Sequence, residues 1–375
     1  MRSDIASLLD KHKAFWKMEE LDRPLMNFIG FTPMELPLAD GRMAEEDIHL
    51  TPELLSPEYI HSPKQYFPHT YAWPHSIFHT DVGGPARQVD AFLPIQPYFK
   101  VPWMEAIIGC KIRVGLSANT MWSEPIWSED WYKKDCKVEI KEEWLNKLKE
   151  FVKFCVDNFF PSYLISHTLM RGPIDMFEAL VGIKNLCLSV YKAPEKSVEL
   201  LSELAKVTIK VMEEQLKIIP PFHGGYSNQY GVWSPGKYVY LQADASHAIS
   251  PKLYEEYLSP IHNEVSEKFE YSILHLHSGP LYEKGPSFAR IVAREKAKSI
   301  EVSIDPPPHS GPPVTELLPL LKIIHEEKPL IIMGHFTFDE LKKIMNTLSS
   351  NGLYIGSYYR PIVLREVSER PTKPG

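Results

Sequence analysis

The segment from Tyr271 to Gly279 carries two histidines two positions apart, His275 and His277, at the end of an apolar run. Successive side chains of a strand point to opposite faces, so the two imidazoles share one face while the leucines between them take the other. Two neighbouring imidazoles can chelate a metal such as zinc, or hold an anion and move protons. A metal needs at least one further ligand, so two hydrogen-bonded histidines at a strand end remain the alternative.

Three more residues with suitable chemistry follow apolar runs: Asp244, Asp305 and His335. In a parallel barrel the active site is built at the carboxyl ends of the strands, which is where these residues fall. Asp305 ends a polar strand face that also holds Glu301 and Ser303, and this face points at a polar cavity or at a hydrogen-bonded layer. Each of the three could serve as a catalytic group or a further ligand. The alternatives are loop-capping carboxylates for the aspartates and an ordinary loop histidine for His335.

Candidate substrate-binding residues come from two other segments. Arg171 precedes Gly172 and Pro173 at a predicted helix start, a place suited to anchor a carboxylate or phosphate, unless it forms only a surface ion pair. A glycine-rich loop over 223–233 contains three aromatic residues that could form a wall or lid over the pocket or simply pack there. These are Tyr226, Tyr230 and Trp233.

The elements that must position these residues follow a regular order. From about residue 160 onward, short apolar runs alternate with longer helical patterns, which predicts successive βα units and a parallel sheet. The predicted strands are 163–166, 238–242, 271–277, 299–305, 329–333 and 353–356, and the predicted helices are 174–181, 195–219, 252–269, 288–297, 315–325 and 339–348. The first part is less regular: we expect a helix within 1–24, a strand over 25–30 and loop-rich insertions over 32–122. The fold class is thus α/β, as a single barrel domain over 1–375 with an irregular N-terminal extension.

Composition excludes several classes of function. The chain has 375 residues, 44% of them apolar and 24% charged, which is typical of a globular protein. A net charge of −7 without a Lys/Arg cluster argues against nucleic-acid binding. The 4 cysteines show no Cys-x-x-Cys spacing, and neither a secretory signal nor a membrane-spanning run is present. We therefore expect a cytoplasmic protein without membrane partners, and a homo-oligomer stays open.

Five segments together resemble the uroporphyrinogen decarboxylase superfamily, over most of the chain. Their order and spacing carry the resemblance, and none alone would suffice. They are Leu21-Asp-Arg-Pro24, Pro102-Trp-Met-Glu-Ala-Ile-Ile-Gly109, Arg171-Gly-Pro-Ile-Asp-Met-Phe-Glu-Ala-Leu-Val-Gly182, Ser250-Pro-Lys-Leu-Tyr-Glu-Glu-Tyr-Leu-Ser-Pro260 and His275-Leu-His277-Ser-Gly279. The resemblance implies a TIM (β/α)8 barrel of the uroporphyrinogen decarboxylase type, with the pocket in the barrel mouth.

The absence of an arginine after the first predicted strand helps to decide which branch of the superfamily the chain resembles. The porphyrinogen decarboxylases resemble one another in an arginine-bearing loop after the first strand, which holds the many carboxylates of their substrate. The matching stretch here is Gly30-Phe-Thr-Pro-Met-Glu-Leu-Pro37, without arginine. This argues against a tetrapyrrole polycarboxylate substrate.

The chain is nearer in type to the cobalamin-dependent methyltransferases of the superfamily. These move a methyl group from a corrinoid protein to a thiol such as coenzyme M, and bind zinc through a His-x-Cys motif and a second Cys near the last strand. His275 falls on the family's histidine, but His277 replaces the first cysteine, and the segment 354–360 has no second one. The resemblance thus implies zinc or another divalent metal on His275 and His277, completed by His335, Asp305 or Asp244.

Three functions stay open on these grounds. The first is a methyltransferase acting between a corrinoid protein partner and a small thiol or other acceptor, assisted by a metal, with Asp305 or Asp244 completing the metal shell or acting as base. The second is a carboxy-lyase without metal, in which Arg171 holds the carboxylate of a small substrate and a histidine protonates the carbanion. The third is a ligand-binding homologue without turnover.

Overall fold

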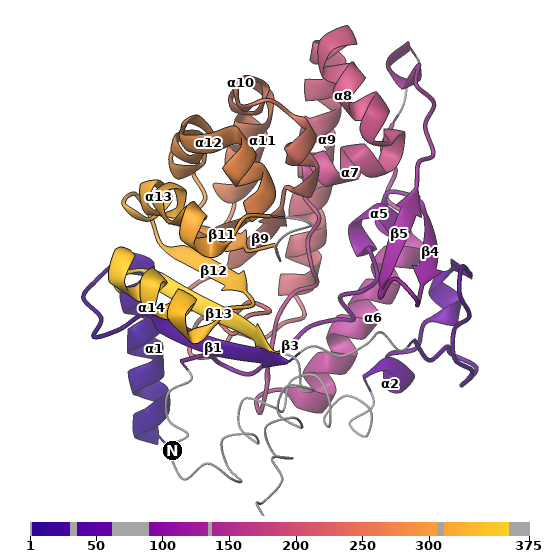
Figure 1. Ribbon diagram of the computed structural model, residues 1–375. Coiled ribbons are helices and arrows are strands. Elements are labelled where there is room, and N and C mark those ends of the chain that lie inside the picture. The colour runs from indigo at the N-terminus through magenta and orange to yellow at the C-terminus, as the bar shows by residue number, and fades with distance from the viewer. Residues whose placement is uncertain (1, 31–35, 62–89, 134–136, 306–310, 360–375) are drawn as a thin grey trace, which may run out of the picture.

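A parallel sheet forms the centre of the molecule in the computed structural model, which describes residues 2–30, 36–61, 90–133, 137–305 and 311–359 (Figure 1). Its six strands lie in the order β1-β13-β12-β11-β10-β9, and all neighbours are parallel. Their bounds are β1 Leu25–Gly30, β9 Tyr238–Gln242, β10 Tyr271–His277, β11 Ser299–Ser303, β12 Leu330–Gly334 and β13 Leu353–Tyr359. The predicted α/β class is confirmed.

Further backbone hydrogen bonds continue the sheet at both edges. At the β1 edge, the Asp90 amide donates to the Met26 carbonyl (2.9 Å). At the β9 edge, the Gln242 amide donates to the Met170 carbonyl (3.0 Å). The segments after Asp90 and before Met170 contain β3 (Pro94–Ile95) and β6 (Leu164–Ile165), which pair in parallel with each other. Closure into an eight-stranded barrel stays a prediction.

Helices follow the strands and cover the outer face of the sheet, as Figure 1 shows for α12, α13 and α14. In the C-terminal part these are α7 Pro173–Val181, α8 Ile183–Lys192, α9 Pro194–Leu216, α10 Pro251–Leu253, α11 Ser259–Ser266, α12 Ser278–Ala293, α13 Val314–His325 and α14 Phe338–Thr347. In the N-terminal part they are α1 Arg2–Lys17, α2 Pro57–Ile60, α5 Trp103–Ile107 and α6 Glu142–Phe159. None of the helices described here is both long and apolar enough to cross a membrane.

The remaining short elements lie mostly outside the central sheet. β2 (His49–Leu50), β4 (Lys111–Gly115) and β5 (Thr120–Glu124) form a small antiparallel sheet within the predicted insertion. The parts of that insertion at 31–35 and 62–89 lie outside the described residues. The single turns and two-residue strands are η1 Pro52–Leu54, η2 Trp131–Lys133, η3 Asp244–Ala248, η4 Tyr254–Leu258, β7 Tyr226–Ser227 and β8 Trp233–Ser234.

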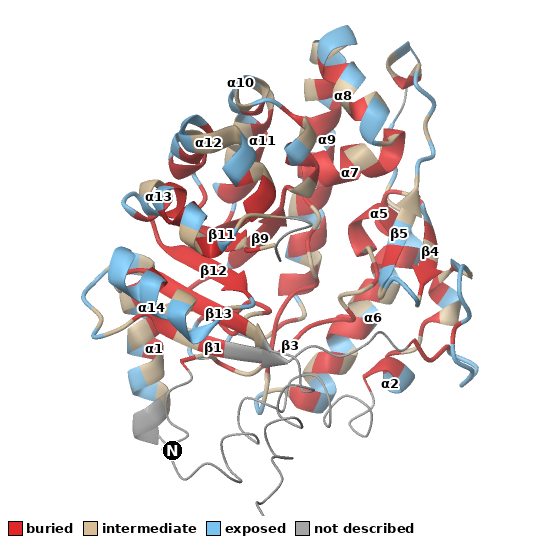
Figure 2. Ribbon diagram, in the orientation of Figure 1, coloured by how far each residue is buried: buried red, intermediate tan, exposed pale blue. Residues whose placement is uncertain are grey.

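Burial explains why the apolar runs became central strands. Every residue of β9 and β12 is buried, and Figure 2 shows β9, β11 and β12 mainly in red while many outward-facing parts of the helices are pale blue. Strands covered on both faces lose all their apolar surface to the core, which a continuous apolar run satisfies. Helix α14 also begins as its sequence demands, with Thr337 and Glu340 forming a capping box.

Two predicted helices differ from the observed ones. The helix expected over 252–269 is interrupted by a π-helical turn, Tyr254–Leu258, and Pro260 follows in the first turn of α11. The helix expected over 288–297 begins ten residues earlier, at Ser278, and Gly285 interrupts it with φ of 67° just before Pro286. Both interruptions lie at or next to a proline or glycine within an otherwise helical pattern, since these residues disturb the regular hydrogen-bond ladder.

Gly172 allows the chain before α7 to approach β9 closely. Its amide donates to the Gln242 carbonyl (3.0 Å), and a Cβ atom at Gly172 would lie 2.1 Å from that oxygen.

We expect Gly172→Ala to lower the free energy of unfolding by about 3 kcal/mol, because backbone atoms must move apart. Urea unfolding measures the change. Gly224→Ala is the control, since nothing lies within 4 Å there, and its positive φ of 80° should cost only about 1 kcal/mol. Equal losses would contradict the close-packing argument.

The buried carboxyl of Glu295, which follows α12, is expected to make the free energy of unfolding depend on pH. Glu295 is 4% exposed and lies 4.0 Å from the His262 ring, and burial raises its pKa to about 7. The native state therefore holds this proton between pH 4.5 and 7 while the unfolded state loses it, so stability falls as pH rises through this window.

We expect Glu295→Gln to remove this loss, so that its stability relative to wild type rises by about 3 kcal/mol from pH 4.5 to pH 7.5. Urea unfolding at several pH values measures the difference. The exposed Glu267 gives the control, Glu267→Gln, whose stability should run parallel to wild type. A constant difference between Glu295→Gln and wild type would contradict the assignment.

Candidate metal centre

The two histidines of β10 lie side by side at the carboxyl end of the strand. Their ring centroids are 4.9 Å apart and their planes are nearly perpendicular, at 86°. The His275 side chain is 4% exposed and that of His277 is 37% exposed. The pair thus runs from the interior toward the surface of this end of the sheet.

Each imidazole is held by a carboxylate at its Nδ1 atom. His275 bonds Glu301, its register partner on β11, and His277 bonds Asp305 two residues beyond that strand, at 2.7 Å. A carboxylate accepts a hydrogen bond, so each Nδ1 carries a proton, and Nε2 keeps its lone pair when the ring is neutral. The carboxylates therefore fix both the tautomer and the orientation of the rings.

Asp244 faces the two Nε2 atoms from the start of η3, directly after β9. Its Oδ1 lies 3.3 Å from Nε2 of His275 and 3.6 Å from Nε2 of His277. All three atoms lie within 4.8 Å of one another, and no other group of this kind is found in the part of the chain that the structure describes. Nε2 of His275 and Oδ1 of Asp244 are buried without a hydrogen-bond partner among the described residues. These two buried atoms lie 3.3 Å apart, so either a proton or a cation must lie between them.

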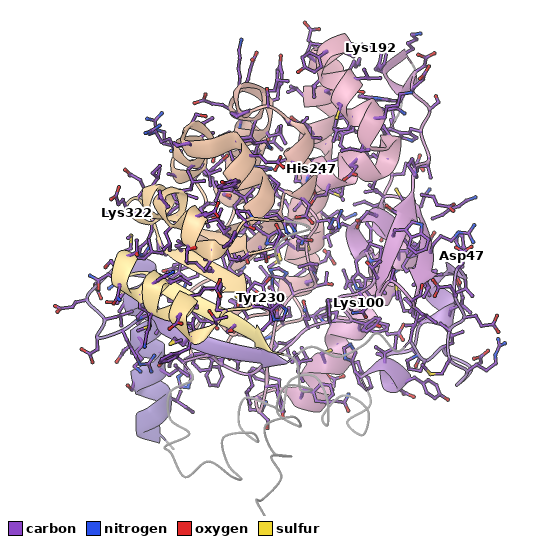
Figure 3. All side chains as sticks on the ribbon, in the orientation of Figure 1. Asp47, Lys100, Lys192, Tyr230, His247 and Lys322 are labelled. Carbon is purple, nitrogen blue, oxygen red and sulfur yellow. The ribbon has the colours of Figure 1, made fainter. Side chains whose placement is uncertain are left out.

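The Glu301 carboxylate is itself held in place by hydrogen bonds from two neighbouring side chains. It is fully buried, and it accepts hydrogen bonds from the Tyr240 hydroxyl (2.9 Å) and the Ser303 hydroxyl (3.1 Å). The Tyr240 hydroxyl lies 3.3 Å from that of Tyr230, which is labelled in Figure 3. A chain of tyrosines therefore supports the carboxylate that orients His275.

Asp305 is positioned by the first turn of α12. Its second carboxylate oxygen accepts from the Ser278 hydroxyl and the Gly279 amide, each at 3.2 Å. The amide of Asp305 donates in turn to the Ser278 hydroxyl (2.8 Å). The helix start thus fixes the residue that orients His277, and donors at a helix N-terminus favour the charged carboxylate.

The electrostatics of the cluster favour positive charge between these groups. Burial alone would lower the pKa of His275, but Glu301 and Asp244 raise it to about 10. Burial also opposes the rise at His277, whose pKa is nevertheless raised by Asp305 and Asp244. Burial would raise the pKa of Asp244, but the contacts with His275 and Arg171 hold it well below its usual range. A metal cation between the two Nε2 atoms and Asp244 would balance the negative charge of the carboxylates, as protons on the imidazoles do in its absence.

Arg171 lies beside this cluster, within a group of carboxylates. Its guanidinium is 3.4 Å from Glu105, 3.6 Å from Asp175 and 3.9 Å from Asp244. Burial would lower its pKa, but these carboxylates together raise it. The predicted anion anchor therefore already has three anionic neighbours within the protein.

Three other predicted site residues lie elsewhere. His335 is exposed, and its Nδ1 bonds the Tyr358 carbonyl (2.9 Å) rather than the histidine pair. Trp233 is 1% exposed, and its carbonyl accepts from Trp16, whose ring packs on Tyr271 at the start of β10. Tyr226 lies beside it on the β7–β8 pair.

The predicted aromatic lid is therefore corrected for Tyr226 and Trp233, which lie at the opposite end of the sheet from His277. They pack there because α1 covers that end and buries the Trp233 ring in an apolar cluster with Leu9 and Phe92. Of the three aromatic residues, Tyr230 alone is linked to the candidate centre, through Tyr240.

Sequence reasoning did not assign roles to Glu301, Tyr240, Glu105 and Asp175. For Glu301 a signal was present, because a charged residue in the middle of a buried strand is rarely left unpaired. Glu105 and Asp175 lie within apolar helical patterns and carry a similar signal. No local signal shows that they meet Arg171, because three separate segments have to come together.

The arrangement fits a divalent metal ion. Two ligand atoms bound about 2.1 Å from a tetrahedral zinc lie roughly 3.4 Å apart, close to the 3.3 and 3.6 Å separations found around Asp244 Oδ1. Two imidazoles and one carboxylate form a ligand set typical of catalytic zinc and of related metals, with a position left for substrate. Carboxylates on the far ring nitrogens are the usual supports of such ligands.

Comparisons with known proteins agree with the fold. No protein-family model matches the chain, and no curated protein matches it in sequence. A methyltransferase from Methanosarcina mazei has a similar structure, with a TM-score of 0.57 over 93% of this chain and 92% of that chain. The two sequences are 13% identical, so the similarity concerns the fold.

Proposed function

We propose that this protein is an enzyme that transfers a methyl group to a small thiol, with zinc or a similar divalent metal held by His275, His277 and Asp244. The observation that carries the metal site is the convergence of three ligand atoms, two of them buried without a hydrogen-bond partner among the described residues. Methyl transfer is supported by the fold shared with a methyltransferase and by the resemblance of the sequence segments.

When bound, the metal would lower the pKa of an acceptor thiol and keep it as a nucleophilic thiolate. The residues of the chain prepare the site for this role. Glu301 and Asp305 hold the imidazoles with Nε2 free, and their charge increases the basicity of the ligands. This compensates in part for His277, which takes the place of a cysteine thiolate in the resembling family.

The proposal includes a closed (β/α)8 barrel of the uroporphyrinogen decarboxylase type. The hydrogen bonds at the two edges of the sheet support it, because the segments 90–95 and 164–171 would complete eight strands in chain order. In such a barrel the carboxyl ends of the strands form the active-site mouth. Asp244, His275 and His277 come from those ends of β9 and β10.

The methyl donor in this proposal is a methylated corrinoid, carried by a partner protein. The thiolate sulfur attacks the methyl carbon, a carbon–sulfur bond forms, and the carbon–cobalt bond breaks with its electron pair left on cobalt. The step needs no further oxidant or reductant, and only the acceptor proton must leave.

Decarboxylation is less well supported. It requires Arg171 to hold a substrate carboxylate, but Glu105, Asp175 and Asp244 already surround that guanidinium. An added anion would meet three like charges, which costs binding energy. The same charges favour cations at this end of the protein.

Metal analysis combined with a transfer assay tests the proposed function. We expect about one zinc or similar ion per chain after anaerobic purification without chelator, and metal-dependent conversion of free methylcobalamin and a thiol to the methyl thioether. Mass spectrometry measures the metal and the product. Protein that binds no metal at micromolar zinc would overturn the metal site, and equal turnover after chelator treatment would overturn its role.

A further inference from the structure

A cavity of about 290 Å³ opens beside the candidate metal centre, between α5, β5 and α7. Arg171 separates the two: it lines the cavity and also lies 3.9 Å from Asp244. The volume is near the lower limit of small-molecule sites and far exceeds that of a bare metal ion. The cavity can therefore hold a small organic ligand.

Two of the carboxylates that line this cavity each have one oxygen without a hydrogen-bond partner among the described residues. These oxygens are Oε2 of Glu105 and Oδ2 of Asp175, whose side chains are 3% and 0% exposed. A buried acceptor without a donor costs about 1–3 kcal/mol, and more when it is charged. Within the described part of the chain, Oδ2 of Asp175 has only the ion pair with Nε of Arg171, at 3.6 Å, so a ligand with N–H donors could satisfy both oxygens better than the protein does.

The charges on the cavity wall are unbalanced. Glu105, Asp175 and the half-buried Glu178 face one guanidinium, that of Arg171. Burial raises the pKa of all three carboxyls, that of Asp175 to about 7, because the low-dielectric surroundings disfavour their charge. A cationic ligand would offset this cost, whereas an anion would add to it.

The rest of the wall is apolar and comes mainly from Met121, Trp122, Pro125 and Ile183. An inorganic ion gains nothing from such surfaces, whereas a short carbon chain does. Trp122 is also an aromatic residue of this wall, and aromatic rings attract ammonium groups. Size, charge and apolar walls thus agree on the same class of ligand.

We propose that this cavity binds the ammonium group of a small primary amine, with N–H donors to Glu105 and Asp175 and the carbon chain against Trp122 and Ile183. A quaternary ammonium group does not fit equally, because it offers no N–H to the two unpartnered oxygens. That the amine belongs to the substrate of the methyl transfer rests on the proposed function, whereas its binding does not.

Calorimetric titration with n-propylammonium and its neutral counterpart 1-propanol tests the proposal, on protein with and without metal. We expect n-propylammonium to bind at least tenfold more tightly than 1-propanol, and at least tenfold more tightly than tetramethylammonium or propionate. Removal of the metal should leave this preference in place. The binding site can then be established even if the metal site fails, and the reverse also holds.

The variants Glu105→Gln and Glu178→Gln should each weaken n-propylammonium binding about tenfold, and Glu203→Gln on the exposed face of α9 is the matched control. Glu178 is less buried than Glu105, so its variant keeps the test open if Glu105→Gln does not fold. Equal binding of n-propylammonium and 1-propanol, or a preference for propionate, would overturn the proposal. Unchanged affinity in both cavity variants would overturn it as well.

Discussion

The His277→Ala variant should bind zinc at least 100-fold more weakly than wild type and lose methyl transfer at micromolar zinc. It removes one of three converging ligand atoms, and even residues that only orient metal ligands typically contribute 10–100-fold to affinity. His277 is the better choice than His275 because its side chain is 37% exposed, so its loss leaves the buried part of β10 intact. Equilibrium dialysis with zinc, followed by elemental analysis, measures the affinity.

His335→Ala is the matched control, because it removes an exposed histidine at the end of a nearby strand that contacts Tyr358 instead. We expect wild-type zinc affinity for it. Thermal unfolding of both variants shows whether a weaker zinc affinity comes from the missing ligand or from a destabilised fold. Equal zinc affinity of His277→Ala and wild type would exclude this histidine as a ligand.

Glu301→Gln should weaken zinc binding 10–100-fold, although Glu301 touches no metal in our proposal. Its carboxylate fixes the proton of His275 on Nδ1 and supplies negative charge behind the ring, and glutamine keeps the shape but not the charge. The fold should tolerate the change because the amide oxygen can take the Oε2 position and accept from the Tyr240 hydroxyl and His275, while the amide NH2 group donates to the Ser303 hydroxyl. Competition with a chromogenic chelator measures the affinity.

Ser303→Ala provides the comparison, since it removes one hydrogen bond to Glu301 and leaves the carboxylate and His275 in place. A change in zinc affinity below about threefold is expected, on the basis that one neutral donor contributes about 1 kcal/mol or less. If both variants bind zinc as wild type does, Glu301 serves only to fill the protein interior beside the sheet.

The two predictions together distinguish the proposed metal ligands from the carboxylates that orient them. His275 and His277 each have one nitrogen toward the centre and one toward a carboxylate, and the two carboxylates are held by different elements, β11 and the first turn of α12. The orientation of both rings is therefore set by hydrogen bonds within the protein and needs no metal. Rigid, pre-oriented ligands reduce the cost of ordering the site upon binding.

Much of the fold was predictable from local pattern. The strands of the C-terminal half and most of its helices follow from apolar runs and helical periodicity, because each element is buried in the way its own residues require. Prediction failed where the signal was not local. The break at 254–258 and the early start of α12 at Ser278 depend on how proline and glycine are accommodated by neighbours.

For the candidate site, the sequence by itself determined that His275 and His277 share one face at a strand end, because alternation along a strand is a local property. It also placed Asp244 and Asp305 after neighbouring runs, without ranking them. Only the tertiary structure decided that Asp244 faces both Nε2 atoms while Asp305 and Glu301 hold the opposite nitrogens. The physical reason is that these roles depend on the register between strands and on the path of each loop, which are set by packing of the whole sheet rather than by any one segment.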